Sequence, residues 1–296
     1  MKEIQKVLLV VNPISGDLNK ENIIQRVEIE VKKIDAQLKT YRTSGENDRE
    51  KIQKLISESD FDRVLIAGGD GTNKVVAEAL KDFDIPIAII PAGSANGLAM
   101  NLGISKNLDE QIKIALGNCV TQMNMLEING ELCLHISDLG LNAELIKNYH
   151  NSRIRGKMGY LLQSIPTLWE SKYPFKFEIQ IDDKKLSRKG ILLAFANAKK
   201  YGTGANVNPK GKMDDGVFEI LIFKDFDILE ILKTLRNETD VNSEFVEIIP
   251  VKKARVFCKK PIAFQVDGEY IGKVTSIEIR LLKEKLKIAV PTKNNI

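Results

Sequence analysis

The first 125 or so residues alternate apolar runs with segments of helical spacing, and this alternation limits the fold more than any other feature of the chain. Lys6–Pro13, Arg63–Ala67 and Ile85–Gly93 have the length and apolar content of buried strands. Asn22–Lys39 carries apolar residues at helical spacing. Strands that alternate with helices predict a parallel sheet covered on both faces, whose ligands bind at the carboxyl ends of the strands. The other elements predicted here are a strand at Leu38–Ser44 and helices at Asp48–Ser57 and Thr72–Leu80.

After about residue 125 the pattern changes to strands joined by turns. Asn129-Gly130 and Asp267-Gly268 are hairpin signals, and one amphipathic helix is predicted at Asp227–Asn237. We therefore predict two domains, residues 1–125 and residues 126–296, with the last residues able to return to the first domain. The strand-like segments of this mostly antiparallel second domain are Phe175–Ile181, Gly190–Ala198, Val217–Phe223, Ala254–Cys258 and Ser276–Leu282.

Charge and composition exclude several classes of protein. The net charge of +4 is too small to indicate nucleic-acid binding. No apolar run reaches about 18 residues, so no transmembrane helix is expected, and the N-terminus is typical of a first strand rather than a signal peptide. The two histidines give little support to a zinc site or a Ser-His-Asp triad. Three separated cysteines indicate reduced thiols in a cytoplasmic protein.

Three glycine-containing loops follow predicted strands. NPISG (Asn12–Gly16) and PAGSANGLA (Pro91–Ala99) are suited to holding a phosphate on backbone N–H groups, although each alone is also typical of a plain turn. GGDGTN (Gly68–Asn73) is more specific, and Thr72 is expected to cap the helix that follows. Asp70 is unexpected there, because a carboxylate about 4 Å from a phosphate oxygen is unfavourable by on the order of 4 kcal/mol.

Acidic turns recur in the second half, in KMDDGVFEI (Lys212–Ile220) and QVDGEY (Gln265–Tyr270). Taken singly, each is typical of a solvated turn or a hairpin tip. Mg²⁺ prefers carboxylate and carbonyl oxygens, so acids brought near a phosphate site from a second domain would suit a magnesium ion.

Together these motifs resemble the lipid kinase family of diacylglycerol, sphingosine and ceramide kinases. GGDGT, PAGSANGLA, the DDG motif and the DGE motif occur in the family's order over nearly the whole chain. The resemblance implies a Rossmann-like α/β nucleotide-binding domain followed by an antiparallel β-sandwich domain, the NAD kinase/diacylglycerol kinase-like fold. It also implies an active site between the domains and transfer of the γ-phosphate of ATP to the hydroxyl of a diacylglycerol or sphingoid-type lipid.

The resemblance further implies roles for individual residues. Glu269 or Asp70 is the base that acts on the lipid hydroxyl, and these two assignments compete; Asp267, of the same DGE motif, is the third catalytic candidate. The Mg²⁺ site uses Asp215, with backbone carbonyls of Lys212 and Val217. The expected nucleotide-binding residues are Asn12, Pro13, Ser15, Gly16, Thr43, Gly68, Gly69, Asp70, Gly71, Thr72, Asn73, Lys74, Ser94 and Asn96.

The sequence departs from the family at two points. Asn73, Lys74 and Val75 stand where the family commonly has a hydrophobic residue, Asn and Glu. PAGSANGLA is closer to the sphingosine kinase form, which weakens a direct assignment to diacylglycerol. Two alternatives therefore stay open: an NAD kinase-like small-molecule kinase, and a non-catalytic nucleotide- or lipid-binding relative.

The expected partners are a lipid alcohol and a membrane surface, with a homodimer as one arrangement that family members adopt. Asn151–Trp169 mixes Arg and Lys with apolar residues, as an interfacial helix does, although a helix covering the β domain is at least as compatible with this composition. The predicted location is cytoplasmic and peripheral to the membrane.

Overall fold

The computed structural model describes residues 3–16, 18–150, 174–200, 206–225 and 244–292. These residues divide into two compact units. The first contains residues up to Met123 together with the segment from Glu284 onward, and the second runs from Asn124 to Lys283. The helix predicted at Asp227–Asn237 and the segment Asn151–Trp169 lie outside the described residues.

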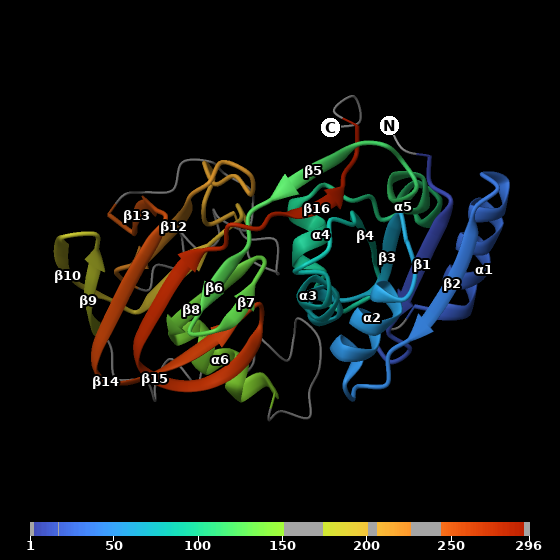
Figure 1. Ribbon diagram of the computed structural model, residues 1–296. Coiled ribbons are helices and arrows are strands. Elements are labelled where there is room, and N and C mark those ends of the chain that lie inside the picture. The colour runs from blue at the N-terminus through green and yellow to red at the C-terminus, as the bar shows by residue number, and fades with distance from the viewer. Residues whose placement is uncertain (1–2, 17, 151–173, 201–205, 226–243, 293–296) are drawn as a thin grey trace. The chain divides into compact units, whose positions relative to one another are not determined.

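In its described part, the first unit is built on a six-stranded sheet with the order β2-β1-β3-β4-β16-β5 (Figure 1). Neighbouring strands are parallel except β16 and β5, which are antiparallel. The last strand, β16, comes from the end of the chain and lies between β4 and β5. The strands are β1 (Lys6–Val11), β2 (Gln37–Arg42), β3 (Arg63–Gly68), β4 (Ile87–Pro91), β5 (Val120–Met123) and β16 (Leu286–Ala289).

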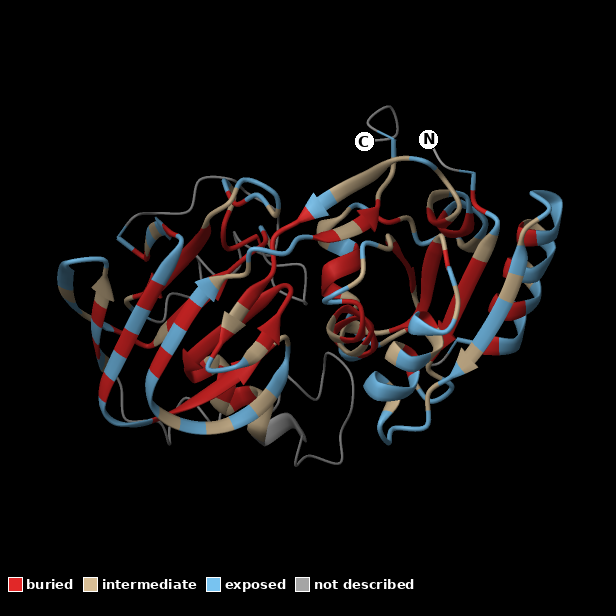
Figure 2. Cartoon of the chain, viewed as in Figure 1, coloured by how far each residue is buried: buried red, intermediate tan, exposed pale blue. Residues whose placement is uncertain are grey.

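Helices cover both faces of this sheet, as the alternating pattern predicts. One hydrophobic cluster joins α1 and α5 to alternate residues of β1 and β3, including Val7, Leu9 and Leu65. The intervening residues, such as Leu8 and Ile66, are equally buried and lie on the opposite face by strand alternation, while α2 and α3 pack against each other. Figure 2 shows β1 and β3 as buried, whereas the edge strand β2 is largely exposed. The helices are α1 (Lys20–Lys33), α2 (Asp48–Ser57), α3 (Asp70–Ala79), α4 (Gly97–Asn101) and α5 (Leu108–Ala115).

The helix predicted over Asn22–Lys39 was wrong at its C-terminal end. The structure ends α1 at Lys33, because Asp35 adopts a left-handed backbone conformation (φ 54°) that no α-helix continues through. Leu38 continues the apolar spacing of the helix although it belongs to β2, because it packs against the same hydrophobic cluster. Helical spacing alone could not separate these two elements.

In its described residues, the second unit is an antiparallel ten-stranded sheet with the path β13-β12-β11-β8-β14-β15-β6-β7, and with β9 and β10 attached through β14. The long strand β14 pairs with β9 near its start and with β8 near its end, and register shifts separate the two parts. Strands from both parts enclose one aromatic-rich cluster. The elements are β6 (Leu126–Ile128), β7 (Glu131–Cys133), β8 (Ile136–Gly140), α6 (Leu141–His150), β9 (Phe175–Ile181), β10 (Lys184–Gly190), β11 (Leu192–Ala196), β12 (Phe218–Phe223), β13 (Val246–Val251), β14 (Lys253–Val266) and β15 (Glu269–Leu281).

Both hairpin signals are confirmed. Asn129-Gly130 joins β6 to β7, and Asp267-Gly268 joins β14 to β15. All four residues have positive φ, as the two central positions of a type I′ turn require.

Candidate active site

Three loops meet at the carboxyl edge of the parallel sheet, after β1, β3 and β4. A Cβ atom added to Gly93 would lie 2.4 Å from the Cα of Gly69, so the backbones of the second and third loops are in direct contact. A Cβ on Gly16, which has φ of +53°, would lie 2.7 Å from the carbonyl oxygen of Ala92. Glycine is required at these contacts because any side chain would push the loops apart. The structure therefore brings all three glycine-containing loops together.

A side-chain hydrogen bond also joins the first loop to the second. The side-chain amide of Asn12 donates to the hydroxyl of Thr72 (3.1 Å), and its carbonyl oxygen accepts from the N–H of Ile14 (3.1 Å). Gly68 leaves room for that hydroxyl, since a Cβ there would lie 2.5 Å from Thr72 Oγ1. Thr72 itself is buried in the first turn of α3, which begins at Asp70. The expectation that Thr72 caps this helix was wrong: its hydroxyl accepts from Asn12 instead.

Asp70 holds the second loop to the third. Its two carboxylate oxygens accept the N–H groups of Gly97 (2.8 Å) and Leu98 (3.0 Å), the first two residues of α4. Both oxygens are thus used within the protein to orient a neighbouring loop. This geometry answers why an acid stands in a glycine loop, because the carboxylate is directed at backbone donors of the third loop.

The third loop is shaped by Asn96, whose backbone is left-handed (φ 55°). Its side-chain oxygen accepts the N–H of Gly93 (2.9 Å) and its amide donates to the carbonyl of Gly93 (2.7 Å). Asn96 therefore stabilises the loop rather than extending from it. Ser94, between these two residues, is exposed and available to a ligand.

Lys20 is a residue of this site that the sequence did not reveal. Its ammonium group is buried, with 6% of the residue exposed, and it donates to the backbone carbonyls of Ser15, Leu18 and Ala92. The hydroxyl of Ser15 also donates to Ala92 (3.1 Å), so two side chains tie the first loop to the third. A lone lysine at the start of a helix usually indicates a solvated surface, so the sequence carried no signal for this contact.

The loop after β2, which contains Thr43, is organised by Asp48. The carboxylate of Asp48 accepts the N–H groups of Ser44 (2.9 Å) and Gly45 (2.7 Å) and the hydroxyl of Tyr41 (2.6 Å). Burial by itself would raise the pKa of Asp48, but these hydrogen bonds outweigh it and hold the pKa below its ordinary value. Burial and the same contact raise the pKa of Tyr41 far above its ordinary value. Thr43 is thereby held on a defined loop, half-buried.

Other expected nucleotide-binding residues of the second loop differ in exposure. Gly71 is exposed, whereas the side chains of Asn73 and Lys74 are buried within α3. The backbone N–H of Asn73 is also used, since it donates to the carbonyl of Gly69 (3.1 Å). Pro13 is exposed at the tip of the first loop.

In the second unit, Asp267 and Glu269 occupy different environments although only one residue separates them. The carboxylate of Asp267 accepts the N–H groups of Leu134 (2.8 Å), His135 (2.9 Å) and Ile136 (3.1 Å). It therefore fixes the tip of the β14–β15 hairpin against the segment between β7 and β8. Glu269, at the start of β15, is exposed.

The expected metal-binding segment offers hard oxygen donors. Asp215 is exposed, and one of its oxygens accepts the N–H of Val217 (3.2 Å). Among the described residues, no three His, Cys, Asp or Glu side chains gather as a metal site. A divalent ion at Asp215 would therefore be held by one carboxylate, backbone carbonyls such as those of Lys212 and Val217, water and phosphate oxygens. Mg²⁺ suits this donor set, because it usually keeps several waters.

Glu219 is a buried carboxyl near that segment which the sequence analysis did not single out. It accepts a hydrogen bond from the side-chain amide of Asn208 (2.7 Å). Burial raises the pKa of Glu219, and the negative charge of Asp215 adds to this shift. A cation at Asp215 would relieve that repulsion.

Comparisons with known proteins agree with this architecture. Residues 6–128 match the diacylglycerol kinase catalytic domain, and residues 137–290 match the YegS C-terminal NAD kinase beta sandwich-like domain. A diacylglycerol kinase of Bacillus subtilis (strain 168) is 24% identical over 280 residues, covering 90% of this chain and 91% of the relative.

Two solved structures show the same fold. A diacylglycerol kinase from Bacillus anthracis matches with a TM-score of 0.75 at 19% identity, covering 98% of each chain. An NAD kinase from Archaeoglobus fulgidus in complex with ATP matches with a TM-score of 0.56 at 15% identity, covering 99% of this chain and 97% of that one. At these identities the structures establish the fold alone. In the part of the chain that the structure describes, no helix has the length and apolar character needed to cross a membrane.

Proposed function

The chain belongs to the lipid kinase family that joins a diacylglycerol kinase catalytic domain to a YegS C-terminal NAD kinase beta sandwich-like domain, and from this premise we propose that it transfers the γ-phosphate of ATP to the hydroxyl of a lipid alcohol in the presence of Mg²⁺. The observation that carries the proposal is the direct backbone contact between Gly69 and Gly93, with Gly16 packed beside them. Backbone N–H groups of loops that follow parallel strands are suited to phosphate binding.

We propose that the exposed residues of the loops contact the ligand. Ser94 and Gly71 are open to a ligand at the third and second loops, and Thr43 lies on the loop that Asp48 fixes. Asn12, Ser15 and Lys20 keep the loops in contact, so their role is to preserve the arrangement of backbone donors. Phosphoryl transfer depends mainly on such positioning and on charge neutralisation.

We assign the base to Glu269. Asp70 and Asp267 each accept two or more backbone N–H groups of neighbouring segments, whereas Glu269 is exposed at its hairpin. In the proposed reaction the lipid O–H bond breaks and its proton passes to the Glu269 carboxylate. The lipid oxygen forms a bond to the γ-phosphorus, and the bond from that phosphorus to the bridging oxygen breaks as ADP leaves. A positioned base typically contributes about 10²–10⁴-fold to the rate.

Asp215 and the carbonyls of Lys212 and Val217 are the residues we propose to hold Mg²⁺. When bound, the ion would neutralise phosphate charge. The exposed carboxylate of Asp215, which accepts the N–H of Val217, fits that role.

The decisive experiment offers the purified protein radiolabelled ATP with Mg²⁺ and a lipid extract, with NAD as an alternative acceptor. We expect labelled lipid and no labelled NADP. Labelled NADP without labelled lipid would favour the NAD kinase-like alternative, which the resemblance to an NAD kinase fold keeps relevant. ATP binding without transfer to either acceptor would favour a non-catalytic relative. The identity of the labelled lipid would separate diacylglycerol from sphingoid substrates.

A lipid acceptor also requires that the protein reach a bilayer, so we propose peripheral membrane contact. Sedimentation with vesicles of anionic lipid tests this directly. Removal of the Arg153 and Arg155 charges is expected to weaken sedimentation if Asn151–Trp169 makes the contact. Light scattering of the same sample tests whether the protein is a homodimer.

A further inference from the structure

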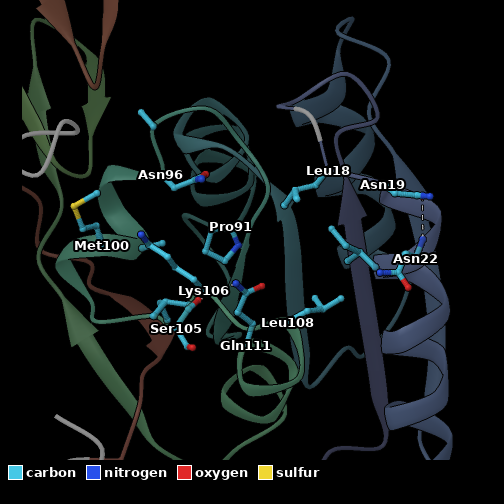
Figure 3. Close-up of a pocket in the computed structure, with 14 residues that line it drawn as sticks. Leu18, Asn19, Asn22, Pro91, Asn96, Met100, Ser105, Lys106, Leu108 and Gln111 are labelled. Carbon is cyan, nitrogen blue, oxygen red and sulfur yellow. Dashed lines mark hydrogen bonds between the residues drawn. The ribbon is translucent and has the colours of Figure 1, made fainter. Parts of the chain in front are cut away.

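A cavity of about 440 Å³ lies within the first unit, on the face of the sheet that α1 and α5 cover. Three segments line it: the start of α1, the third glycine loop with α4, and the stretch that leads into α5 (Figure 3). Its volume falls within the range of about 300–1,000 Å³ that small-molecule sites usually have. Of the expected nucleotide-binding residues, only Asn96 lines it.

Its interior presents carbon rather than hydrogen-bonding groups. Ile23, Pro91, Ala99 and Ile104 form much of the wall. Three of the amides that line it are already bonded inside the protein. Asn19 caps α1 by accepting the N–H groups of Glu21 and Asn22, Asn96 bonds twice to Gly93, and Gln111 donates to the carbonyl of Ser105. The exposed side-chain amide of Asn22 lies at the start of α1. The apolar wall itself offers a nucleobase or a sugar few partners, whereas an aliphatic chain needs none.

The rim adds exposed apolar side chains and a positive charge. Leu18 and Met100 line the cavity and are among the large apolar side chains that the described residues expose to solvent. Lys106, also in the lining, is exposed on the same segment that leads to α5. An apolar cavity with an ammonium group at its rim is complementary to a single aliphatic chain that carries an anionic head group.

We propose that this cavity binds a single-chain anionic amphiphile, such as a fatty acid, with the chain between α1, α4 and α5 and the head group at Lys106. The occupant would touch the third loop on Pro91, Ala95 and Asn96, the same loop that carries Ser94. This site lies entirely in the α/β unit, and its occupation does not depend on the proposed kinase activity.

Calorimetric titration of the whole protein with laurate, below its micelle concentration, tests the proposal. We expect saturable binding that Met100→Glu weakens at least tenfold, because the new carboxylate repels the head group and adds charge to an apolar rim. Ile34→Glu is the matched control, since Ile34 is 41% exposed against 40% for Met100. Ile34 lies at the C-terminal end of α1, whereas the cavity is lined by the start of that helix. The Ile34→Glu variant should bind laurate as the unmodified protein does.

Two further measurements separate this cavity from a lipid-substrate site elsewhere. Ala95→Trp, at an exposed position of the lining, should block the chain without relying on Met100. Lys106→Glu should weaken laurate binding while Lys39→Glu, an equal charge change on β2, does not. Equal laurate binding by the unmodified protein, Met100→Glu and Ala95→Trp would overturn the proposal, as would equal affinity for laurate and lauryl alcohol.

Discussion

Gly69 and Gly93 approach so closely that a methyl group on Gly93 would lie 2.4 Å from the Cα of Gly69. The two residues belong to loops after neighbouring strands, β3 and β4, which pair in parallel through Gly68 and Pro91. Close backbone contact at this point holds the two loops together at one edge of the sheet.

Gly93→Ala should separate the second and third loops. A Cβ in contact with backbone cannot be relieved by a side-chain rotation, so we expect a loss of about 1–3 kcal/mol in the free energy of unfolding and a clear loss of ATP affinity. Denaturant unfolding and ATP titration measure the two effects. Gly103→Ala is the control, because it meets no atom within 4 Å and carries only the penalty of positive φ. Equal ATP affinity in both variants would contradict the proposed role of the contact.

Asp70→Asn should lower stability as well as activity. Asn has an NH2 group in place of one carboxylate oxygen, so it cannot accept the N–H groups of both Gly97 and Leu98. One charge-assisted hydrogen bond is lost and the other is weakened. We expect a loss on the order of 1.5–3 kcal/mol in denaturant unfolding, accompanied by weaker ATP binding. A large fall in kcat with unchanged unfolding and unchanged ATP affinity would instead identify Asp70 as the base.

Glu269→Gln should reduce kcat for the lipid alcohol by about 10²–10⁴-fold, because the amide cannot take the proton. Because Glu269 is exposed, we expect only a small change in the thermal unfolding midpoint and unchanged ATP affinity. Glu284→Gln, also exposed, should retain full turnover. The assignment fails if Glu269→Gln turns over at the normal rate.

Asp215→Asn should raise the Mg²⁺ concentration that gives half-maximal activity by at least about tenfold, since it removes the charged donor of the proposed site. Asn keeps an oxygen that can accept the N–H of Val217, so the turn itself should survive. Titration of activity with Mg²⁺ measures the effect, and Asp214→Asn on the neighbouring residue is the matched control. A larger shift for Asp214→Asn would transfer the metal role to that side chain.

Glu219→Gln should change how stability depends on pH. Burial, reinforced by Asp215, raises the pKa of Glu219 in the folded protein above its ordinary value of 4.5. The folded state therefore binds this proton more tightly than the unfolded state, and stability falls as pH rises from about 4.5 through the folded-state pKa. The Gln variant should lose this decline and keep the hydrogen bond from Asn208. The measurement is the free energy of unfolding of both proteins from about pH 4 upward. An equal decline in the two proteins would contradict the assignment.

Much of the fold could be predicted because its signals are local. The helix at Asp48–Ser57 and the strand at Phe175–Ile181 begin and end where the sequence pattern placed them. The error at Asn22–Lys39 arose because Leu38 keeps helical spacing with α1 while belonging to β2. Strand β16 was not predicted, since four residues near the chain end carry too little pattern to reveal their partners β4 and β5.

For the candidate site, the sequence by itself determined which loops carry glycine and acidic residues, and that they follow parallel strands. That much is local, because turn chemistry and strand pattern depend on neighbours in the chain. Only the tertiary structure decided what those side chains do. Asp70 accepts N–H groups from residues 27 and 28 positions away, and Lys20 donates to a carbonyl 72 positions away. Hydrogen bonds of such span depend on how strands are ordered in a sheet, and no spacing within a motif records that order.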